Sequence, residues 1–179
     1  MICNSGGAQG ADSIFELYCA KNGIEVIAWS FDGHNTKSPV RKILTKDELD
    51  EGFEHVKIAN KTLKRMIYGL KPYVKKLLSR NWFQVKNSEA IYAISTIRDD
   101  FQQVDGGTGW AIMEGVDNHK SIYVFEQNLN SWFKYNYDIC KFEKYDFIPK
   151  LTNTFAGVGT RDINQNGINA IKELLKNGK

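Results

Sequence analysis

The chain of 179 residues contains only three cysteines, Cys3, Cys19 and Cys140, and their spacing matches no metal-binding motif. An odd number of cysteines argues against a disulfide framework and favours a reducing compartment. The sequence also lacks any apolar run long enough to span a membrane. Residues 1–6 contain no basic region followed by an apolar stretch, which is the pattern of a secretion signal. These absences predict a cytoplasmic protein without membrane insertion.

The sequence also contains few histidines and has a small net charge. The three histidines, His34, His55 and His119, are scattered and form neither a metal motif nor a triad with a nucleophile. We therefore expect no metal and no resident cofactor. The net charge is +3, and the main basic run, Lys57 to Lys76, is typical of a solvated helix face, with an anion-attracting surface as the alternative. Such a modest charge disfavours a nucleic acid partner.

Glycine, in contrast, is concentrated in three segments that share one context. They are Asn4–Asp12 (NSGGAQGAD), Asp105–Trp110 (DGGTGW) and Phe155–Arg161 (FAGVGTR). Each connects a predicted strand to a predicted helix, which points backbone N–H groups and a helix N-terminus at an anion, usually a phosphate. Plain tight turns are the alternative, because glycine is also the default turn residue.

Predicted strands and helices alternate along the chain. Strands are expected at residues 2–4, 24–30, 88–95, 121–125 and 155–158, and helices at 12–22, 46–78 (broken at Lys71-Pro72), 110–116 and 164–176. Residues 32–39 are expected to form a loop and residues 131–147 a small aromatic antiparallel hairpin. This order predicts an α/β fold: a single Rossmann-like, doubly wound, mostly parallel sheet with helices on both faces, plus the hairpin as an insertion.

The motifs resemble those of the SLOG superfamily, which includes DNA-processing protein A-like domains, LOG phosphoribohydrolases and nucleotide-sensing domains of bacterial immune proteins. Family members begin with a strand and a glycine turn similar to Gly157–Arg161. They continue with a strand that ends in a segment like Ser5–Asp12, an Arg-Asn pair like Arg80-Asn81, and a Gly-Gly-Thr-Gly turn like Gly106–Gly109. In this chain the family's first segment stands last.

The resemblance therefore implies a circularly permuted single domain over residues 1–179, with the family's first strand and helix at residues 152–177. Proteins tolerate such permutation when their termini lie close together at the surface. It requires the first dozen and the final twenty-odd residues of this chain to form neighbouring strands, so that all three glycine segments meet at one edge of the sheet.

Several residue types in these segments are suited to binding a phosphorylated ligand. Glycines let the backbone approach a phosphate, Arg80 and Arg161 are candidate phosphate forks, and Asn81 could contact a base or ribose edge. Asp12 could hold a ribose hydroxyl or merely cap a helix. The predicted binding set is Ser5, Gly6, Gly7, Ala8, Gln9, Asp12, Trp29, Arg80, Asn81, Gly106, Gly107, Thr108, Gly109, Trp110, Gly157, Gly159, Thr160 and Arg161.

The tryptophans of this chain allow two interpretations. Trp110 directly follows a glycine segment and could stack on a base, and Trp29 at the end of a strand could border the pocket. Trp82 is expected in the core. For each of the three, packing in the core is the alternative to ligand contact.

The resemblance favours binding over hydrolysis. LOG phosphoribohydrolases carry Pro-Gly-Gly-x-Gly-Thr-x-x-Glu, whose glutamate assists cleavage of an N-glycosidic bond. Here Asp105 replaces the proline, Trp110 the threonine and Met113 the glutamate. Glu114 comes one residue late, which on a helix is a rotation of about 100° away from the family's catalytic position.

The resemblance thus implies a protein that binds a nucleotide-derived small molecule, such as an ADP-ribose derivative or a cyclic nucleotide signal. It would act as a sensor or a sequestering protein, for example in phage counter-defence. One alternative is an N-glycosidase on nucleoside monophosphates, with Arg80 and one of Glu114, Asp105 or Asp12 as acid and base. Another is a DNA-processing-like domain that binds nucleic acid. Many relatives are dimers or larger, so a homo-oligomer is expected, with residues 132–147 as interface or lid.

Overall fold

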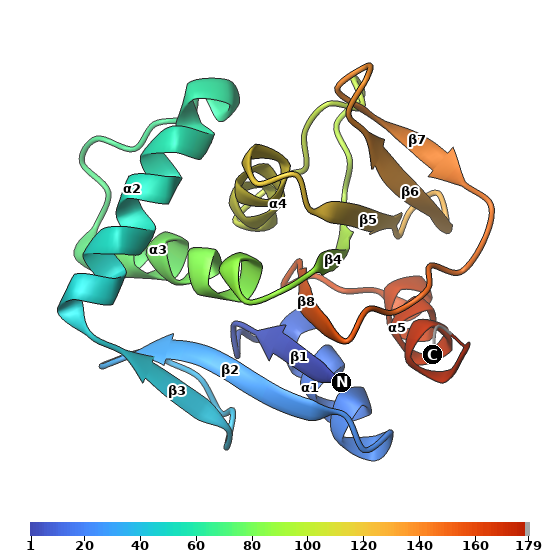
Figure 1. The fold of residues 1–179 in the computed structure, drawn as a ribbon, viewed down its shortest axis with the longest axis horizontal. Helices are drawn as coiled ribbons and strands as arrows, with labels where there is room; N and C mark the ends of the chain where they lie inside the picture. The colour runs from blue at the N-terminus through green and yellow to red at the C-terminus, as the bar shows by residue number, and fades with distance from the viewer. Residues whose placement is uncertain (178–179) are drawn as a thin grey trace.

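The computed structural model describes residues 1–177 as one eight-stranded sheet with helices on both faces (Figure 1). The strands are β1 (Ile2–Ser5), β2 (Glu25–Phe31), β3 (Arg41–Leu44), β4 (Ala90–Ser95), β5 (Ser121–Glu126), β6 (Ser131–Asn136), β7 (Lys141–Tyr145) and β8 (Thr154–Gly159). The helices are α1 (Ala11–Lys21), α2 (Lys46–Leu63), α3 (Pro72–Lys86), α4 (Thr108–Asp117) and α5 (Gln165–Asn177). The fold is α/β with a mostly parallel, doubly wound sheet, as the alternation of elements predicts.

The strand order is β3-β2-β1-β8-β4-β5-β6-β7, so the last strand of the chain lies in the middle of the sheet. β8 pairs in parallel with β1 on one side, where Cys3 lies opposite Phe155, and with β4 on the other, where Ile91 lies opposite Ala156. Figure 1 shows the blue and orange-red ends of the chain side by side. The expectation that the two ends of the chain form neighbouring strands is confirmed.

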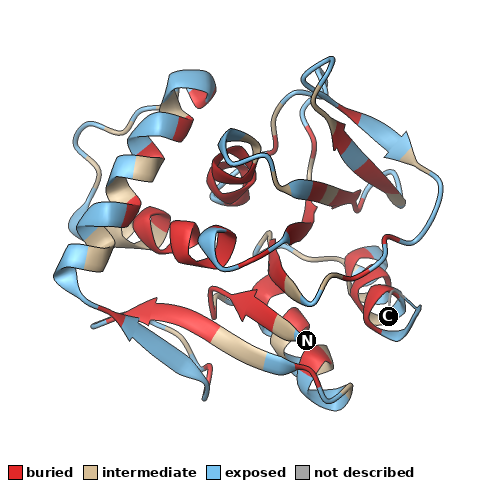
Figure 2. Ribbon diagram, viewed as in Figure 1, coloured by how far each residue is buried: buried red, intermediate tan, exposed pale blue. Residues whose placement is uncertain are grey.

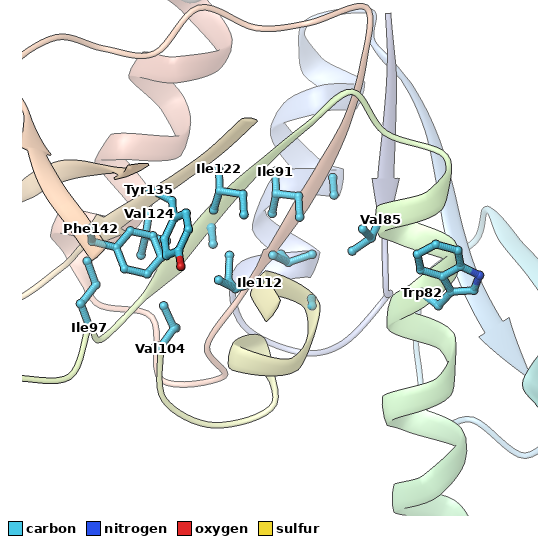
Figure 3. Packing of buried hydrophobic residues seen from close by; sticks show 14 of the residues in the cluster. Trp82, Val85, Ile91, Ile97, Val104, Ile112, Ile122, Val124, Tyr135 and Phe142 are labelled. Carbon is cyan, nitrogen blue, oxygen red and sulfur yellow. The ribbon is translucent and has the colours of Figure 1, made fainter. Parts of the chain in front are cut away.

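Alternate residues of β4 face the two helical layers. Tyr92 and Ile94 pack with residues of α1 and α5, whereas Ile91 and Ala93 pack with residues of α3 and α4. All four side chains are fully buried, and a buried parallel strand of this kind reads as a continuous apolar run. Figure 2 shows the buried residues gathered along the central strands and α4, and Figure 3 shows the packing on the α4 side.

The helix α2 forms an outer layer that rests on α3 and α4. It begins with a capping box, in which Thr45 Oγ1 accepts from the Glu48 amide and the Glu48 carboxylate accepts from the Thr45 amide. Its inner side packs against those two helices through the buried side chains Val56, Ala59, Leu63, Leu78, Trp110 and Met113. α2 thereby holds α3 and α4 in place beside the carboxyl edge of the sheet.

Three local expectations need correction. The strand β3 was not predicted, because Arg41 and Lys42 give it a polar composition and only its pairing with β2 at the sheet edge makes it a strand. The helical pattern of residues 46–78 is two helices separated by the connector 64–71, and the second continues to Lys86. The hairpin of β6 and β7 is confirmed, but it extends the main sheet through antiparallel pairing with β5.

No helix within residues 1–177 is long and apolar enough to cross a bilayer.

Candidate functional site

All three glycine segments contribute to one pocket of about 460 Å³ at the carboxyl edge of the sheet. The first segment supplies Ala8 and Asp12, the second Asp105 to Thr108, and the third Gly159 to Arg161. One wall is a face of α3, and the ends of β4 and β8 form the floor. Ligands of doubly wound sheets bind at such an edge, where the strand order reverses direction.

Arg80 is the most unusual side chain of this pocket. It is 5% exposed, and its buried Nε and Nη1 have no hydrogen-bond partner among residues 1–177. Its nearest anionic neighbour is Asp12, whose Oδ2 lies 3.9 Å from Nη1. A buried guanidinium without acceptors costs free energy that a bound anion would recover, because buried donors require partners.

Asp12 links two of the glycine segments. Oδ2 accepts a hydrogen bond from the Gly6 amide at 3.2 Å, and Oδ1 accepts one from the Gly159 amide at 3.1 Å. Gly6 has no room for a side chain, because a Cβ there would collide with Nη1 of Arg80 and crowd the Asp12 carboxylate. Both carboxylate oxygens of Asp12 are thus engaged in holding β1 and β8 together at the pocket.

Burial shifts the pKa values of both charged groups. It raises the pKa of Asp12 from 3.8 to about 6, although nearby Arg80 acts in the opposite direction. Burial lowers the pKa of Arg80, again against the effect of Asp12. Desolvation therefore outweighs the mutual attraction for each partner, which is expected for a pair that is 3.9 Å apart and not hydrogen bonded.

The second glycine segment leads into the N-terminus of α4. The amides of Gly106, Gly107 and Thr108 have no acceptor among residues 1–177, and α4 has no side-chain cap. A Cβ at Gly106 or Gly107 would meet nothing within 4 Å. At the N-terminus of α1, in contrast, the Ala11 amide already donates to Thr160 O at 2.9 Å. The N-terminus of α4 therefore offers free amides beside the pocket.

Arg65, which was not predicted at the site, holds this segment through hydrogen bonds to its backbone. Its Nη1 donates to Gly106 O at 2.7 Å and its Nη2 to Val104 O at 2.6 Å. The guanidinium also lies 5.9 Å from the centre of the Trp110 ring. Only the connector between α2 and α3 brings Arg65 there, so no local sequence signal marks it.

Part of the first glycine segment lies away from this pocket. Gly7 and Gln9 line a separate, largely apolar pocket of about 810 Å³ between α1 and residues 35–40. The Ser5 hydroxyl donates to the Glu16 carboxylate at 2.7 Å, and the Gly7 amide donates to Ser5 Oγ at 3.1 Å. Ser5, Gly7 and Gln9, which were expected to share one site with the other segments, are thus absent from the lining of the first pocket.

Two predicted glycine contacts are packing positions. Gly157 lies in the middle of β8, where a Cβ would press on the ring of Phe15. Gly109 lies inside the first turn of α4, where a Cβ would collide with Val104 O. Neither residue lines the pocket, because each packs against other parts of the chain.

The tryptophans are core residues. Trp110 is 5% exposed, packs among α2, α3 and α4 and does not line the pocket, which is the core packing that was the alternative to base stacking. Trp29 is also buried, and its Nε1 donates to Asn4 Oδ1 at 2.9 Å rather than facing the pocket. Trp82 is buried as expected, with Nε1 donating to Glu51 Oε1 at 2.9 Å and the ring stacked on His55.

The carboxylates proposed for catalysis are not free at the pocket. Glu114 is buried on α4, outside the pocket lining, and burial raises its pKa well above the usual value. Asp105 lines the pocket but pairs with Arg98, whose Nε lies 2.9 Å from Oδ1. Within residues 1–177, no group of three or more His, Cys, Asp or Glu side chains is placed to hold a metal ion.

The lining of the pocket includes both predicted and unpredicted residues of α3. Asn81 lines the pocket as expected, with Nδ2 3.5 Å from Gly107 O. On the same helix, Val74, Leu77 and Leu78 give the pocket an apolar wall, and Gln84 lies one turn beyond Arg80. The spacing 77, 80, 81 and 84 is a single helix face, so the Arg80-Asn81 pair could have led to these residues.

Comparison of the chain with protein-family models, curated proteins and solved structures found no match. The pocket itself is therefore the basis for assigning a function.

Proposed function

We propose that the protein binds a phosphorylated, nucleoside-type small molecule in the pocket between α3, α4 and the end of β8. The phosphate would lie at the free amides of Gly106, Gly107 and Thr108, within reach of Arg80 and of the exposed Arg161. The sugar or base would pack on the apolar wall of α3.

The observation that carries this proposal is the buried Arg80 guanidinium, whose Nε and Nη1 lack a hydrogen-bond acceptor among residues 1–177. The other buried, unpartnered side-chain atom at this pocket is also a nitrogen, Nε2 of Gln84. A pocket whose unsatisfied buried groups are donors fits a ligand rich in acceptors: a phosphate would satisfy Arg80, and another part of the ligand would satisfy Gln84. A volume of about 460 Å³ is within the range of small-molecule sites.

The hydrogen bonds and positions of the carboxylates support binding of an intact ligand rather than its cleavage. Acid–base cleavage of an N-glycosidic bond needs a carboxyl group that is free to exchange a proton with the ligand. Asp12 uses both oxygens on backbone amides, Asp105 pairs with Arg98, and Glu114 lies outside the pocket. Binding without cleavage is what a sensor or a sequestering protein requires.

One observation favours the second candidate, an N-glycosidase. Asp12 lines the pocket beside Arg80, and burial brings its pKa to about 6, within the range that suits a general acid near neutral pH. Cleavage by this route requires Asp12 to give up its hydrogen bonds to Gly6 or Gly159 when the ligand is bound.

The test is to incubate the protein with nucleoside 5′-monophosphates and with ADP-ribose, measure binding by calorimetry, and analyse the small molecules by mass spectrometry. Saturable binding with intact ligand recovered supports the proposal. Release of free base supports the N-glycosidase, and absence of binding to every one of these compounds contradicts the proposal.

A matched pair of variants connects the result to the pocket. Arg80→Met should weaken phosphate-dependent binding roughly 10- to 100-fold, since a hydrogen bond to a charged group contributes about 1.5–3 kcal/mol. Arg41→Met removes an exposed arginine of β3 outside the pocket and should leave binding unchanged. Equal affinities of the two variants would exclude Arg80 as the anion-binding residue.

A further inference from the structure

Gln84 has a buried side-chain donor that is unused. It is 1% exposed, and its buried Nε2 has no hydrogen-bond partner among residues 1–177. Burying a carboxamide without partners is unfavourable, so such a group in a protein interior calls for an explanation. Gln84 also lines the pocket, so a ligand there could supply the partners.

The position of Gln84 on α3 sets it apart from the phosphate-binding end of the pocket. α3 is followed after three residues by β4, so the C-terminal end of α3 lies toward the amino edge of the sheet and its N-terminal end toward the glycine segments. Gln84 follows Arg80 by four residues, which places it about 6 Å further from those segments along the helix axis. The pocket lining also includes the apolar residues Ala111 and Val158.

A carboxamide offers one donor and one acceptor side by side, and its orientation can be reversed by a flip of the group. The complementary ligand group is an edge that also carries an adjacent donor and acceptor, as nucleobase edges do. A second phosphate fits less well, because it would use the donor and leave the acceptor of Gln84 unpaired.

We infer that Gln84 reads the hydrogen-bonding edge of the ligand's base, while Arg80 and the N-terminus of α4 hold its phosphate. This inference rests on the proposed function and assigns the two ends of the ligand to two levels of the pocket. On this inference the ligand is a nucleotide rather than a sugar phosphate, and Gln84 is the residue that discriminates between these two classes of ligand.

The test compares three probes: ribose 5-phosphate, adenosine 5′-monophosphate, and purine riboside 5′-monophosphate, which lacks the exocyclic amino donor. The wild-type protein should bind adenosine 5′-monophosphate at least roughly tenfold more tightly than purine riboside 5′-monophosphate, because buried polar groups left unpaired penalise the incomplete ligand. Gln84→Met, which conserves length, should abolish this preference and leave the affinity for ribose 5-phosphate within about twofold.

Gln84→Asn serves as a second variant, because it keeps the amide but withdraws it by one methylene, and it should also lose the preference. Thermal unfolding of each variant, followed by circular dichroism, checks that the fold is retained. A preference for adenosine 5′-monophosphate that survives in both folded variants would overturn the inference. So would a wild-type protein that binds the three probes equally.

The outcome is separable from that of the proposed function. If ribose 5-phosphate binds and Arg80→Met removes that binding, the phosphate site stands even when Gln84 shows no role. If no probe binds the wild-type protein, the phosphate site and the role of Gln84 are rejected together.

Discussion

At the scale of single residues, Gly6 and Gly107 illustrate two different needs for glycine. Gly6 leaves space for the Arg80 guanidinium, so that a Cβ would collide with it, whereas a Cβ at Gly107 would enter open space beside the pocket. Gly107 has φ −65°, which any residue adopts. The first glycine is required for the geometry of the arginine, and the proposed function needs the second for access of a ligand to the backbone.

The variants Gly6→Ala and Gly107→Ala should therefore differ in stability but share a binding defect. Gly6→Ala should destabilise the protein by about 1–3 kcal/mol, as overpacking does, and displace Arg80. The free energy of unfolding of Gly107→Ala should lie within about 0.5 kcal/mol of the wild-type value, and this variant should still bind nucleotide more weakly. Urea unfolding and calorimetry measure the two effects, and equal destabilisation by both variants would contradict this assignment.

The raised pKa of Asp12 predicts a pH-dependent stability term. The folded state holds the Asp12 proton more tightly than the unfolded state, so the stabilisation is complete below pH 3.8 and is lost as the pH rises through about 6. The shift corresponds to at most about 3 kcal/mol. Between pH 4 and 7, the unfolding free energy of the wild type should fall relative to that of Asp12→Asn.

The comparison with Asp12→Asn isolates this term because Glu114, whose pKa burial also raises, is present in both proteins. Urea unfolding at each pH provides the measurement. A difference between the two proteins that does not change with pH would mean that Asp12 is ionised normally in the folded state.

At the scale of elements, the segment between β4 and α4 is shaped by a side chain from a distant connector. The two hydrogen bonds of Arg65 fix the carbonyl groups of Gly106 and Val104. The amides of Gly106 and Gly107 have no acceptor among residues 1–177. α3 contributes in another way, because one of its faces carries Leu77, Arg80 and Gln84 along the pocket. The pocket is thus an assembly of elements rather than one glycine loop.

Replacing Arg65 with methionine should loosen this segment. Loss of the two hydrogen bonds should cost about 1–3 kcal/mol locally and speed amide exchange at residues 104–110 more than in the central strand β4. Ligand binding should weaken as well. Hydrogen exchange with mass spectrometry gives the measurement, and unchanged exchange at residues 104–110 would show that Arg65 is not needed to hold the segment.

At the scale of the whole molecule, the first and last strands are paired in the centre of the sheet. The Ile2 amide donates to Asn153 O at 2.8 Å, so β1 starts beside the start of β8. α5 follows β8 and packs on α1, which lies next to β1. Strand pairing and helix packing therefore hold the two ends of the chain side by side. The predicted circular permutation requires this arrangement.

A rearranged chain tests this directly. Opening the chain between Phe147 and Ile148, both exposed, and joining residue 177 to residue 1 with a glycine-serine linker would give the order β8-α5-β1-α1. We expect one cooperative unfolding transition and a nucleotide affinity within about threefold of the wild type, because the core contacts are conserved. A rearranged chain that fails to fold would show that the present order of segments is necessary.

The homo-oligomer stays a prediction, and the lid role of residues 132–147 receives no support from the pocket, which no residue of β6 or β7 lines. Sedimentation equilibrium measures the oligomeric state. The exposed Phe147 at the end of this hairpin gives a position for a disruptive charge if a dimer is found.

The sequence by itself determined the alternation of strands and helices and the three glycine turns at one edge. These depend on hydrophobic periodicity and on turn residues, which act locally along the chain. The pairing of the chain's two ends was expected from the resemblance of the glycine motifs to a known family. Asp12, Arg80, Asn81 and Gly159 were also predicted at the site, because each lies next to a strand end or in a recognisable pair.

Only the tertiary structure decided which way each side chain faces. Trp110 and Trp29 went to the core, Gly7 and Gln9 to a second pocket, and Arg65 and Gln84 to the site. Local patterns do not specify these outcomes, because a residue beside a glycine turn can point toward either layer. For Trp110 the packing of α2 on α3 and α4 makes that choice, and it depends on contacts between residues far apart in the chain.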